Sequence, residues 1–585
     1  MTIEQMALLG YRLYGSARYA EAEQVFMQLT RSAPREPMYW SNLGTARRNQ
    51  GKLDAALAAF ARAAELGATS SDFFFNVGLA HLDRRDYESA RAVLSRALSL
   101  APHDAGIRLE YVRACYESLH TEEALAALES WQGLDDLRGE HLAEAGRRLM
   151  SLGASQRAEE VVQRLATAEL DPRSRLTLVQ ILERTNRLAE ARVALERLQA
   201  DPSSRELGAD LTGVQAQIAQ RESRHEAACV LFERALEDVP DTASRHFLQY
   251  PLARSLDALG RSEEAFATLR QAHRSQLEHL KLTAPLAIAR GAPTMAIAKY
   301  PCDPADAAGW SDPQAPATAD SPIFIVGFPR SGTTLLEQAL DAHPRLRSTD
   351  EQPFVQNALD DLSATGARYP EQLARVTPEQ LQSIRAKYWE RVRGKVPFAP
   401  GERVVDKNPL NLLRLPAIHR LFPNARIVLA IRHPCDVMMS CYMQHFRAPE
   451  FAMVCRDLDT LAANYRRAFD FWYAHAQLLR PAVFELRYER FVADFERQLR
   501  ELCAFLELPW DDAMLAVAGH AQRRGYISTP SYAQVVEPVN ARAVGRWQAY
   551  ERHFAAVLTT LRPYLERWSY EIGGGAGGGP LGNSR

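Results

Sequence analysis

The chain has 585 residues, a length that exceeds one ordinary domain and predicts about three or four folding units. Its residues are 46% hydrophobic and 24% charged, as in globular proteins, and its formal net charge of −2 provides no overall basic field for nucleic acid. The seven cysteines are scattered without a C-x-x-C pair, which disfavours a zinc ribbon or a disulfide framework and favours a reducing compartment. Because no signal peptide is recognised and no run of about 18 apolar residues occurs, we expect a cytoplasmic protein without a membrane span.

The first half of the chain repeats itself with a period near 34 residues. An alanine followed four residues later by an apolar residue recurs at spacings of 34, 34, 34, 34, 33, 37 and 37 residues. Small residues at such offsets let paired helices approach closely, and each pair buries its apolar face only by stacking on its neighbours. The alanines are Ala22, Ala56, Ala90, Ala124, Ala158, Ala191, Ala228 and Ala265, and glycine stands twelve positions before four of them, at Gly10, Gly44, Gly78 and Gly146.

This pattern, together with Trp40-x-x-Leu43-Gly44, resembles the tetratricopeptide repeat. The resemblance predicts that residues 1–282 form an all-α solenoid of about eight helix pairs. The concave face of the solenoid could bind a peptide or a protein partner. Alternatively, the solenoid could stack on the second half of the chain or form a homodimer, and the repeats leave these alternatives open.

The repeat pattern ends before a stretch rich in proline, alanine and aspartate, which we interpret as a linker or a wrapping segment over residues 283–320. Beyond it, four short apolar runs, "PIFIVGF", "ERVVDK", "ARIVLAIR" and "AVFELRY", are separated by segments long enough for helices. They predict an α/β domain with a central parallel sheet over residues 321–571, whose ligand lies at the carboxyl ends of the strands. The last residues, 572–585, form a glycine-rich tail that we expect to be flexible.

The first of these runs continues into a loop that is typical of phosphate binding but lacks one residue. Gly327 and Gly332 have the spacing of G-x-x-x-x-G-K-[ST], yet Thr333 stands at the position of the lysine and Arg330 lies inside the loop. Backbone N–H groups at the start of a helix bind anions whatever side chains follow. Loss of the lysine disfavours a nucleoside triphosphate with Mg²⁺, and the arginine favours a smaller 5′-phosphate.

A second anion pocket is predicted where Arg432 closes a strand and Ser440 lies eight residues further, in the helix that follows. Two pockets suit a nucleotide with phosphates at both 5′ and 3′, such as 3′-phosphoadenosine 5′-phosphosulfate. The two motifs resemble those of sulfotransferases, which share a phosphate-loop-like three-layer α/β fold. The chain is most similar to tyrosylprotein sulfotransferases and to bacterial proteins that join tetratricopeptide repeats to a sulfotransferase domain.

The resemblance implies a role for each matching residue. The loop Arg330, Ser331, Gly332, Thr333 and Thr334 would hold the 5′-phosphosulfate, and Arg432 and Ser440 the 3′-phosphate. Further cofactor contacts would come from Tyr488 in "RYERF", from Ser531 in "SYAQVVEPVN" and from Arg546 before a tryptophan. Two positions depart from the family pattern: Gln444 replaces a second arginine, which shifts phosphate binding toward Arg546, and Glu537 replaces a lysine.

The implied chemistry is transfer of a sulfuryl group to a hydroxyl acceptor without a metal. Glu351 would be the general base, Lys407 and Arg330 would balance the charge that develops, and Ser531 would hold the leaving phosphate. The acceptor could be a peptide or protein tyrosine, a glycan or a small phenol.

Each candidate also has a simpler interpretation. Glu351 or Asp350 could cap a helix, Lys407 could be a solvated residue at a strand end, and Arg432 could pair with Asp436. The rival functions are a phosphate-loop kinase without the lysine and a non-catalytic repeat scaffold that retains a nucleotide pocket.

Overall fold

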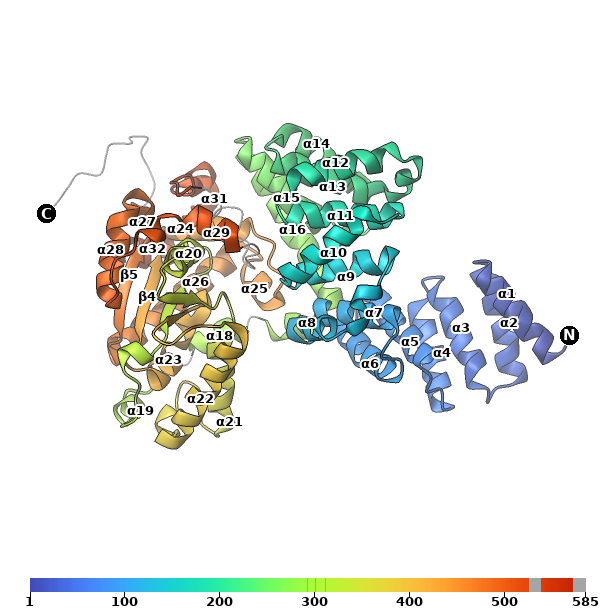
Figure 1. Cartoon of the computed structure of the whole chain (residues 1–585), viewed down its shortest axis with the longest axis horizontal. Helices are drawn as coiled ribbons and strands as arrows, with labels where there is room; N and C mark the ends of the chain where they lie inside the picture. The colour runs from blue at the N-terminus through green and yellow to red at the C-terminus, as the bar shows by residue number, and fades with distance from the viewer. Residues whose placement is uncertain (292, 300, 311, 525–537, 572–585) are drawn as a thin grey trace. The chain divides into compact units, whose positions relative to one another are not determined.

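The computed structural model describes residues 1–291, 293–299, 301–310, 312–524 and 538–571 (Figure 1). Two compact units are distinguished by their contacts: Met1–Ser244 with Glu278–Leu286, and Arg245–Leu277 with Ala287–Arg585. We call them the repeat unit and the catalytic-fold unit.

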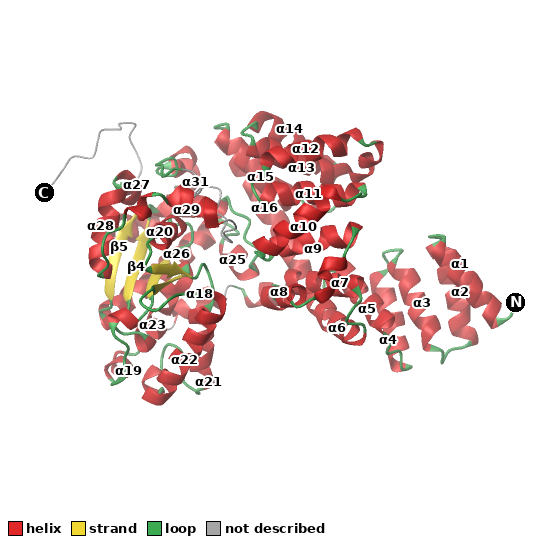
Figure 2. Cartoon of the chain, viewed as in Figure 1, coloured by secondary structure: helices red, strands yellow, loops and turns green. Residues whose placement is uncertain are grey.

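The repeat unit consists of helices arranged in consecutive antiparallel pairs (Figure 2). Together with α15 and α16, which follow in sequence, the helices up to residue 283 form the eight pairs that the repeat pattern predicts. The pairs are α1 (Ile3–Gly15) and α2 (Tyr19–Ser32), α3 (Pro37–Arg48) and α4 (Leu53–Glu65), α5 (Ser71–Asp83) and α6 (Tyr87–Leu100), α7 (Ala105–Glu117) and α8 (Thr121–Glu129), α9 (Gly139–Ser151) and α10 (Ser155–Thr167), α11 (Pro172–Arg184) and α12 (Leu188–Ala200), α13 (Gly208–Arg221) and α14 (His225–Glu237), and α15 (His246–Ala258) and α16 (Ser262–Thr283).

Small residues in the repeat pattern lie where the helices of a pair touch. All eight alanines of the pattern are completely buried. A Cβ atom added to Gly44 would lie 2.7 Å from the ring of Phe60, and one added to Gly78 would lie 2.5 Å from Leu94. These glycines therefore set the distance between the two helices of their pairs.

The last helix pair continues the repeat pattern but packs with the other unit. The predicted boundary at residue 282 follows the sequence repeat, whereas contacts assign α15 and α16 up to Leu277 to the catalytic-fold unit. The side chain of His273 hydrogen-bonds the carbonyl oxygen of Tyr442 at 2.9 Å, and the amide of Gln276 donates to the carbonyl oxygen of Phe446 at 2.7 Å. This helix pair is thus part of the unit that holds the candidate site.

The catalytic-fold unit is built on a five-stranded sheet in the order β2-β3-β1-β4-β5, in which every neighbouring pair is parallel. Four of these strands coincide with the four apolar runs, which confirms the strands that the sequence predicts there. The sequence missed β2, which has only three residues and no apolar run of its own. The strands are β1 (Ile323–Gly327), β2 (Leu346–Ser348), β3 (Arg403–Lys407), β4 (Arg426–Ile431) and β5 (Ala482–Arg487).

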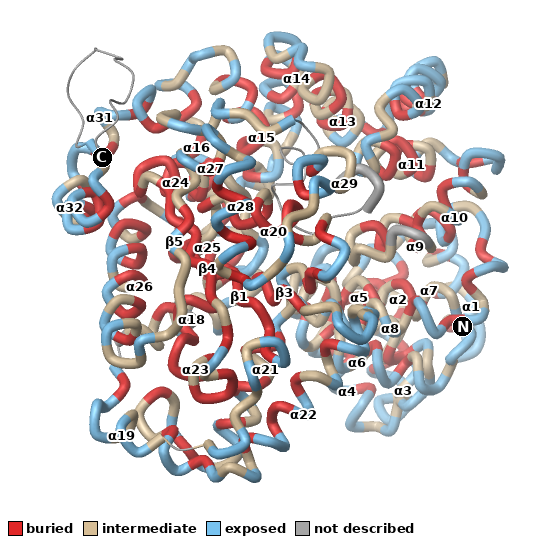
Figure 3. The backbone as a smooth tube through the Cα atoms, turned by 60° about the vertical axis from the view of Figure 1, so that its left-hand side comes forward, coloured by how far each residue is buried: buried red, intermediate tan, exposed pale blue. Residues whose placement is uncertain are grey.

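Helices cover both faces of the sheet, so the unit has the three layers that the sequence predicts. On one face, Leu336 of α20 (Thr333–Asp341) and Leu499 of α28 (Phe495–Leu506) join a buried cluster with Ile323 and Ile325 of β1. On the other face, the ring of Phe324 lies 6.0 Å from that of Phe422, which follows α23 (Leu415–Leu421). Figure 3 shows the central strands β1, β3 and β4 mostly buried, whereas β5 at the edge of the sheet is partly exposed.

Further helices of the unit surround this core. They are α21 (Phe354–Ala364), α22 (Pro378–Lys395), α24 (Pro434–Tyr442), α25 (Pro449–Val454), α26 (Leu458–Leu479), α27 (Tyr488–Ala493), α29 (Val517–Arg524), α31 (Glu551–Phe554) and α32 (Leu558–Arg567). None of the helices in the described part of the chain combines the length and the apolar character needed to cross a membrane.

The segment between the repeats and the first strand wraps around the catalytic-fold unit. It contains the short helices α17 (Pro285–Arg290), α18 (Pro293–Ala296) and α19 (Pro304–Ala308). Asp312 forms a buried ion pair with Arg385 of α22 at 2.5 Å, and Cys302 is buried. Of the two interpretations of this stretch, the wrapping segment therefore describes its structure better than a free linker does.

Candidate functional site

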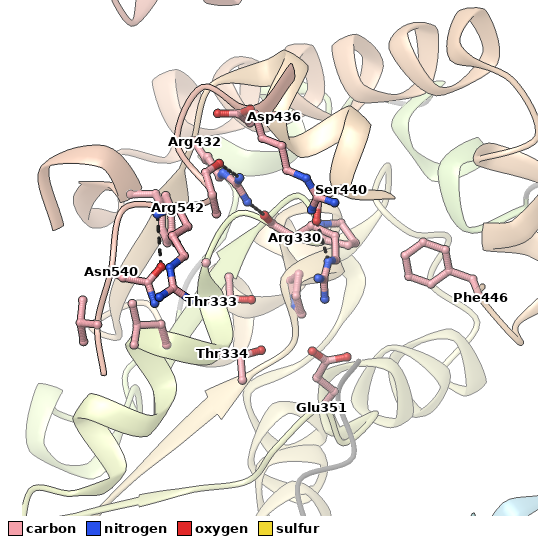
Figure 4. Close-up of a pocket in the computed structure, with 18 of the residues that line it drawn as sticks. Arg330, Thr333, Thr334, Glu351, Arg432, Asp436, Ser440, Phe446, Asn540 and Arg542 are labelled. Carbon is pink, nitrogen blue, oxygen red and sulfur yellow. Dashed lines mark hydrogen bonds between the residues drawn. The ribbon is translucent and has the colours of Figure 1, made fainter. Parts of the chain in front are cut away.

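A cavity of about 720 Å³ lies at the carboxyl ends of the central strands (Figure 4). This is the edge of a parallel sheet at which ligands bind. Its lining includes most of the residues that the sequence singled out, namely Arg330, Gly332, Thr333, Thr334, Glu351, Arg432, Ser440, Tyr488 and Arg546. Ser331 and Lys407 lie directly behind this lining in the loop and in β3, and both are buried.

The loop between β1 and α20 has the geometry of an anion-binding turn. Gly332 is the N-cap of α20 with a φ of 89°, and Arg330 also has a positive φ, 73°. A Cβ atom on Gly332 would lie 2.4 Å from the ring of Tyr488, so both the conformation and the close contact require glycine. The backbone N–H groups that start the nine-residue helix α20 therefore face the cavity with the positive end of the helix dipole.

The two predicted anion pockets form one connected group of side chains. Arg330 Nε donates to Ser440 Oγ at 3.0 Å, and Arg432 Nη1 donates to the carbonyl oxygen of Arg330 at 3.1 Å (Figure 4). Arg432 also donates to the carbonyl oxygen of Ala543, and its guanidinium lies 4.8 Å from the centre of the Tyr488 ring. Burial lowers the pKa of Arg330 from its ordinary value, although an arginine remains charged at neutral pH.

The site fits a ligand that carries phosphate or sulfate groups. Within the described part of the chain, Ser331 Oγ and Arg432 Nε are buried polar atoms without a hydrogen-bond partner. An unsatisfied buried donor costs free energy, and a ligand oxygen would satisfy both groups. With the helix N-terminus and Arg330, these donors match the chemistry of a phosphate or sulfate group.

Lys407 lies between two carboxylates at the end of β3. Its Nζ is 2.7 Å from Glu351 Oε1 and 3.0 Å from Glu337 Oε2, and the lysine is completely buried. Burial on its own lowers the pKa of Lys407, but attraction by Glu337 and Glu351 outweighs burial and leaves the pKa above its ordinary value. Lys407 is therefore a fixed cation beside the candidate base.

Three simpler interpretations of the sequence are wrong. The N-cap of α21 is Pro353 and receives no side-chain hydrogen bond, so neither Asp350 nor Glu351 caps that helix. Lys407 is buried rather than solvated. Asp436 accepts from the backbone N–H groups of Gly545 and Trp547, at 2.7 and 2.9 Å, rather than pairing with Arg432.

Sequence reasoning missed Glu337 and Asp257 at this site and assigned Asp436 to the wrong partner. Glu337 of α20 is completely buried and accepts a hydrogen bond from Ser348, and burial raises its pKa to about 7 against the opposing attraction of Lys407. A glutamate on the apolar face of a helix was the signal that could have revealed it. Asp436 of α24 and Asp257 of α15 hold the segment around Arg546, and no motif in the sequence indicates these distant pairings.

Of three further residues from the sequence analysis, the structure describes one, Gln444. Ser531 and Glu537 lie outside the described residues. The amide of Gln444 donates to the neighbouring carbonyl oxygen of His445 at 3.4 Å, and Gln444 is not part of the cavity lining. Among the residues that the structure describes, no group of three or more histidine, cysteine, aspartate or glutamate side chains is arranged to hold a metal ion.

The fold and the site together define an α/β protein whose phosphate-loop-like turn lacks the lysine and has the geometry of an anion-binding site. The model of the sulfotransferase family matches residues 322–512, and tetratricopeptide-repeat models match residues 8–71, 81–143 and 144–205. Protein-tyrosine sulfotransferase 1 of Danio rerio is 30% identical over 259 residues, which cover 43% of this chain and 72% of that protein. Protein-tyrosine sulfotransferase A of Caenorhabditis elegans is 30% identical over 268 residues, covering 43% of this chain and 67% of that protein.

An uncharacterized protein of Aquifex aeolicus is 31% identical over 252 residues, which cover 41% of this chain but only 32% of that protein. The chain belongs to the sulfotransferase family and carries tetratricopeptide repeats before its sulfotransferase domain.

Proposed function

We propose that the protein transfers the sulfuryl group of 3′-phosphoadenosine 5′-phosphosulfate to a hydroxyl group of an acceptor. The observation that carries this proposal is a single cavity that joins two anion-binding clusters to the Glu351–Lys407 pair. One cluster, the loop with Arg330, suits a 5′-phosphosulfate, and the other, Arg432 with Ser440, suits a 3′-phosphate.

The side chains would divide the chemistry among themselves. Glu351, whose side chain is 39% exposed and faces the cavity, would take the proton of the acceptor hydroxyl. The acceptor oxygen would then bond to sulfur while the bond from sulfur to the 5′-phosphate oxygen breaks. Lys407 and Arg330 would offset the negative charge that develops between sulfur and the leaving phosphate.

For the acceptor, we propose a tyrosine hydroxyl of a peptide or protein. Support comes from two of the relatives, the protein-tyrosine sulfotransferases of Danio rerio and Caenorhabditis elegans. The repeats add support because solenoids of this kind offer extended binding surfaces. A glycan or a small phenol is the alternative acceptor class, and comparing transfer to peptide, glycan and phenol pools distinguishes them.

The rival functions have weaker support. A kinase would need a cation at the position of Thr333 and a site for Mg²⁺, whereas the cations beside the loop here include Arg330 and Arg432. A scaffold that had lost catalysis would not need Lys407 buried between two carboxylates, since burial of charge is costly.

The test compares ligands by thermal stabilisation and then measures transfer. A ligand that prefers the native state raises the unfolding temperature. Adenosine 3′,5′-bisphosphate should do so in the presence of EDTA, and ATP with Mg²⁺ should do much less. A radiolabelled sulfuryl group should pass from the donor to a hydroxyl acceptor. Equal stabilisation by the two nucleotides, or stabilisation without any transfer, would contradict the proposal and favour the kinase or the scaffold respectively.

A further inference from the structure

Two acidic side chains that the proposed chemistry does not use line the cavity, Asp257 and Asp436. Asp257 lies near the end of α15, in the last helix pair of the repeat pattern, and it lines the cavity together with Ala258. A carboxylate in a cavity that binds phosphate groups would repel the ligand if its charge were not compensated. The charge of Asp257 therefore needs a cationic partner beside the cavity.

That partner is Arg546, which is 289 residues away in sequence. Arg546 Nη2 donates to Asp257 Oδ2, and the hydroxyl of Tyr550 donates to the other carboxylate oxygen, Oδ1. The Asp257 side chain is 16% exposed and that of Arg546 34%, so the pair lies at the cavity wall rather than on the open surface. Burial, and then the hydrogen bond to Asp257, raises the pKa of Tyr550, which keeps that hydroxyl a donor.

The backbone on either side of Arg546 is fixed by a second carboxylate. Gly545 has a φ of 73° and caps the short helix Arg546–Tyr550. Asp436 of α24 accepts from the N–H groups of Gly545 and Trp547. Since α24 also carries Ser440, Asp436 ties the backbone of Arg546 to the anion-binding cluster, and Asp257 then fixes the direction of its side chain.

Helix α16, which follows α15, is itself firmly attached to the region after Ser440. The ring of His273 stacks on that of Tyr442 at 4.2 Å with an interplanar angle of 18°, and the side chain hydrogen-bonds the Tyr442 carbonyl oxygen. Burial lowers the pKa of His273 to about 4, so this contact stays neutral near physiological pH. The helix pair can therefore act as a rigid support for Asp257.

We propose that Asp257 is a positioning residue for the donor nucleotide: it holds the guanidinium of Arg546 at the cavity, where Arg546 binds the 3′-phosphate. This inference rests on the proposed function. Arg546 uses one nitrogen, Nη2, for Asp257, while a guanidinium has five N–H donors in a fixed fork. The ion pair and a phosphate contact can therefore exist together, and the last repeat helix pair becomes a component of the donor site.

The test uses the full chain and two nucleotides that differ only in the 3′-phosphate. In calorimetric titration, Asp257→Asn should weaken the binding of adenosine 3′,5′-bisphosphate about tenfold, the size of one lost charged hydrogen bond. The affinity for 5′-AMP should not change. In an Arg546→Ala background the same substitution should have no further effect. A double-mutant cycle of this kind isolates the pair from general damage.

Glu263→Gln is the matched control. Glu263 of α16 pairs with Arg552 and His553, so it joins the last helix pair to the same C-terminal region but does not line the cavity. It should leave both nucleotide affinities unchanged. If Asp257→Asn is too unstable to titrate, Tyr550→Phe removes one of the two hydrogen bonds that orient the carboxylate and should weaken only the 3′-phosphorylated ligand, about threefold.

The outcomes separate the two proposals. Wild-type protein that fails to bind adenosine 3′,5′-bisphosphate overturns the proposed function itself. If the wild type binds it, three results overturn the role of Asp257. The first is unchanged or increased affinity for adenosine 3′,5′-bisphosphate in Asp257→Asn or, where that variant is too unstable, in Tyr550→Phe. The others are an equal loss of affinity for 5′-AMP, or the same loss of affinity when Arg546 is already alanine.

Discussion

At the residue scale, Glu351 is the side chain on which the proposed chemistry depends most directly. Glu351→Gln keeps the volume and the contact with Lys407 but removes the basic group, so kcat should fall by about 10²- to 10⁴-fold. Binding of adenosine 3′,5′-bisphosphate, measured by titration, should persist. Asp350→Asn is the neighbouring control and should retain most activity; if it is the more damaged of the two, the general base is Asp350.

The buried carboxyl group of Glu337 leads to a prediction about how the stability of the protein depends on pH. Its pKa is about 7 in the folded protein and near 4.5 when unfolded, so between these values the folded state holds a proton that the unfolded chain has released. The wild type should therefore lose stability relative to Glu337→Gln as pH rises from about 4.5 to 7, by up to about 3 kcal/mol, and no further above pH 7.

Chemical denaturation of the wild type and the variant at several pH values measures this difference. Glu390→Gln, an exposed position on α22, is the control and should give a difference that does not change with pH. If the stability difference between the wild type and Glu337→Gln also does not change with pH, Glu337 is ionised throughout this range and is simply an ion-pair partner of Lys407.

At the scale of the elements, the loop before α20 depends on Gly332 for two reasons that can be separated. Gly332→Ala meets both a φ of 89° and the ring of Tyr488, whereas Gly366→Ala meets a φ of 88° with open space around it. Both variants should lose about 1 kcal/mol of stability through backbone strain. Only Gly332→Ala should displace Tyr488 and weaken the binding of adenosine 3′,5′-bisphosphate, by about tenfold or more. Equal affinities in the two variants would show that Tyr488 does not contribute to nucleotide binding.

At the scale of the whole molecule, the catalytic-fold unit includes a helix pair that belongs to the repeats by sequence. A fragment of residues 245–571 keeps α15 and α16, and a fragment of residues 287–571 lacks them. The shorter fragment should unfold at a lower temperature, because it exposes Tyr442 and the buried surface beneath α16, and it should bind adenosine 3′,5′-bisphosphate more weakly.

Thermal unfolding and titration of the two fragments, with the full chain as the reference, check this prediction. Equal stability and equal affinity in both fragments would mean that the helix pair is only an attachment for the repeats. An acceptor that reacts well with the full chain but poorly with residues 245–571 would indicate that the preceding repeats bind it.

The sequence by itself determined the features that depend on local spacing. The alanine period predicted eight helix pairs, since helices that touch through small residues need them at every repeat, and all eight alanines are buried. The apolar runs predicted four strands, and the loop from Gly327 to Thr334 placed the anion site, because a strand, a glycine turn and a helix start are consecutive in the chain.

Only the tertiary structure decided which distant charges meet. Glu337 with Lys407, Asp436 with the backbone around Arg546, and Asp257 with Arg546 each join segments that no sequence pattern connects. Likewise, β2 is too short to form an apolar run, and its place in the sheet comes from pairing with β3. Such contacts depend on how the layers pack, and a buried charge can be recognised as part of the site only when its partner is in place.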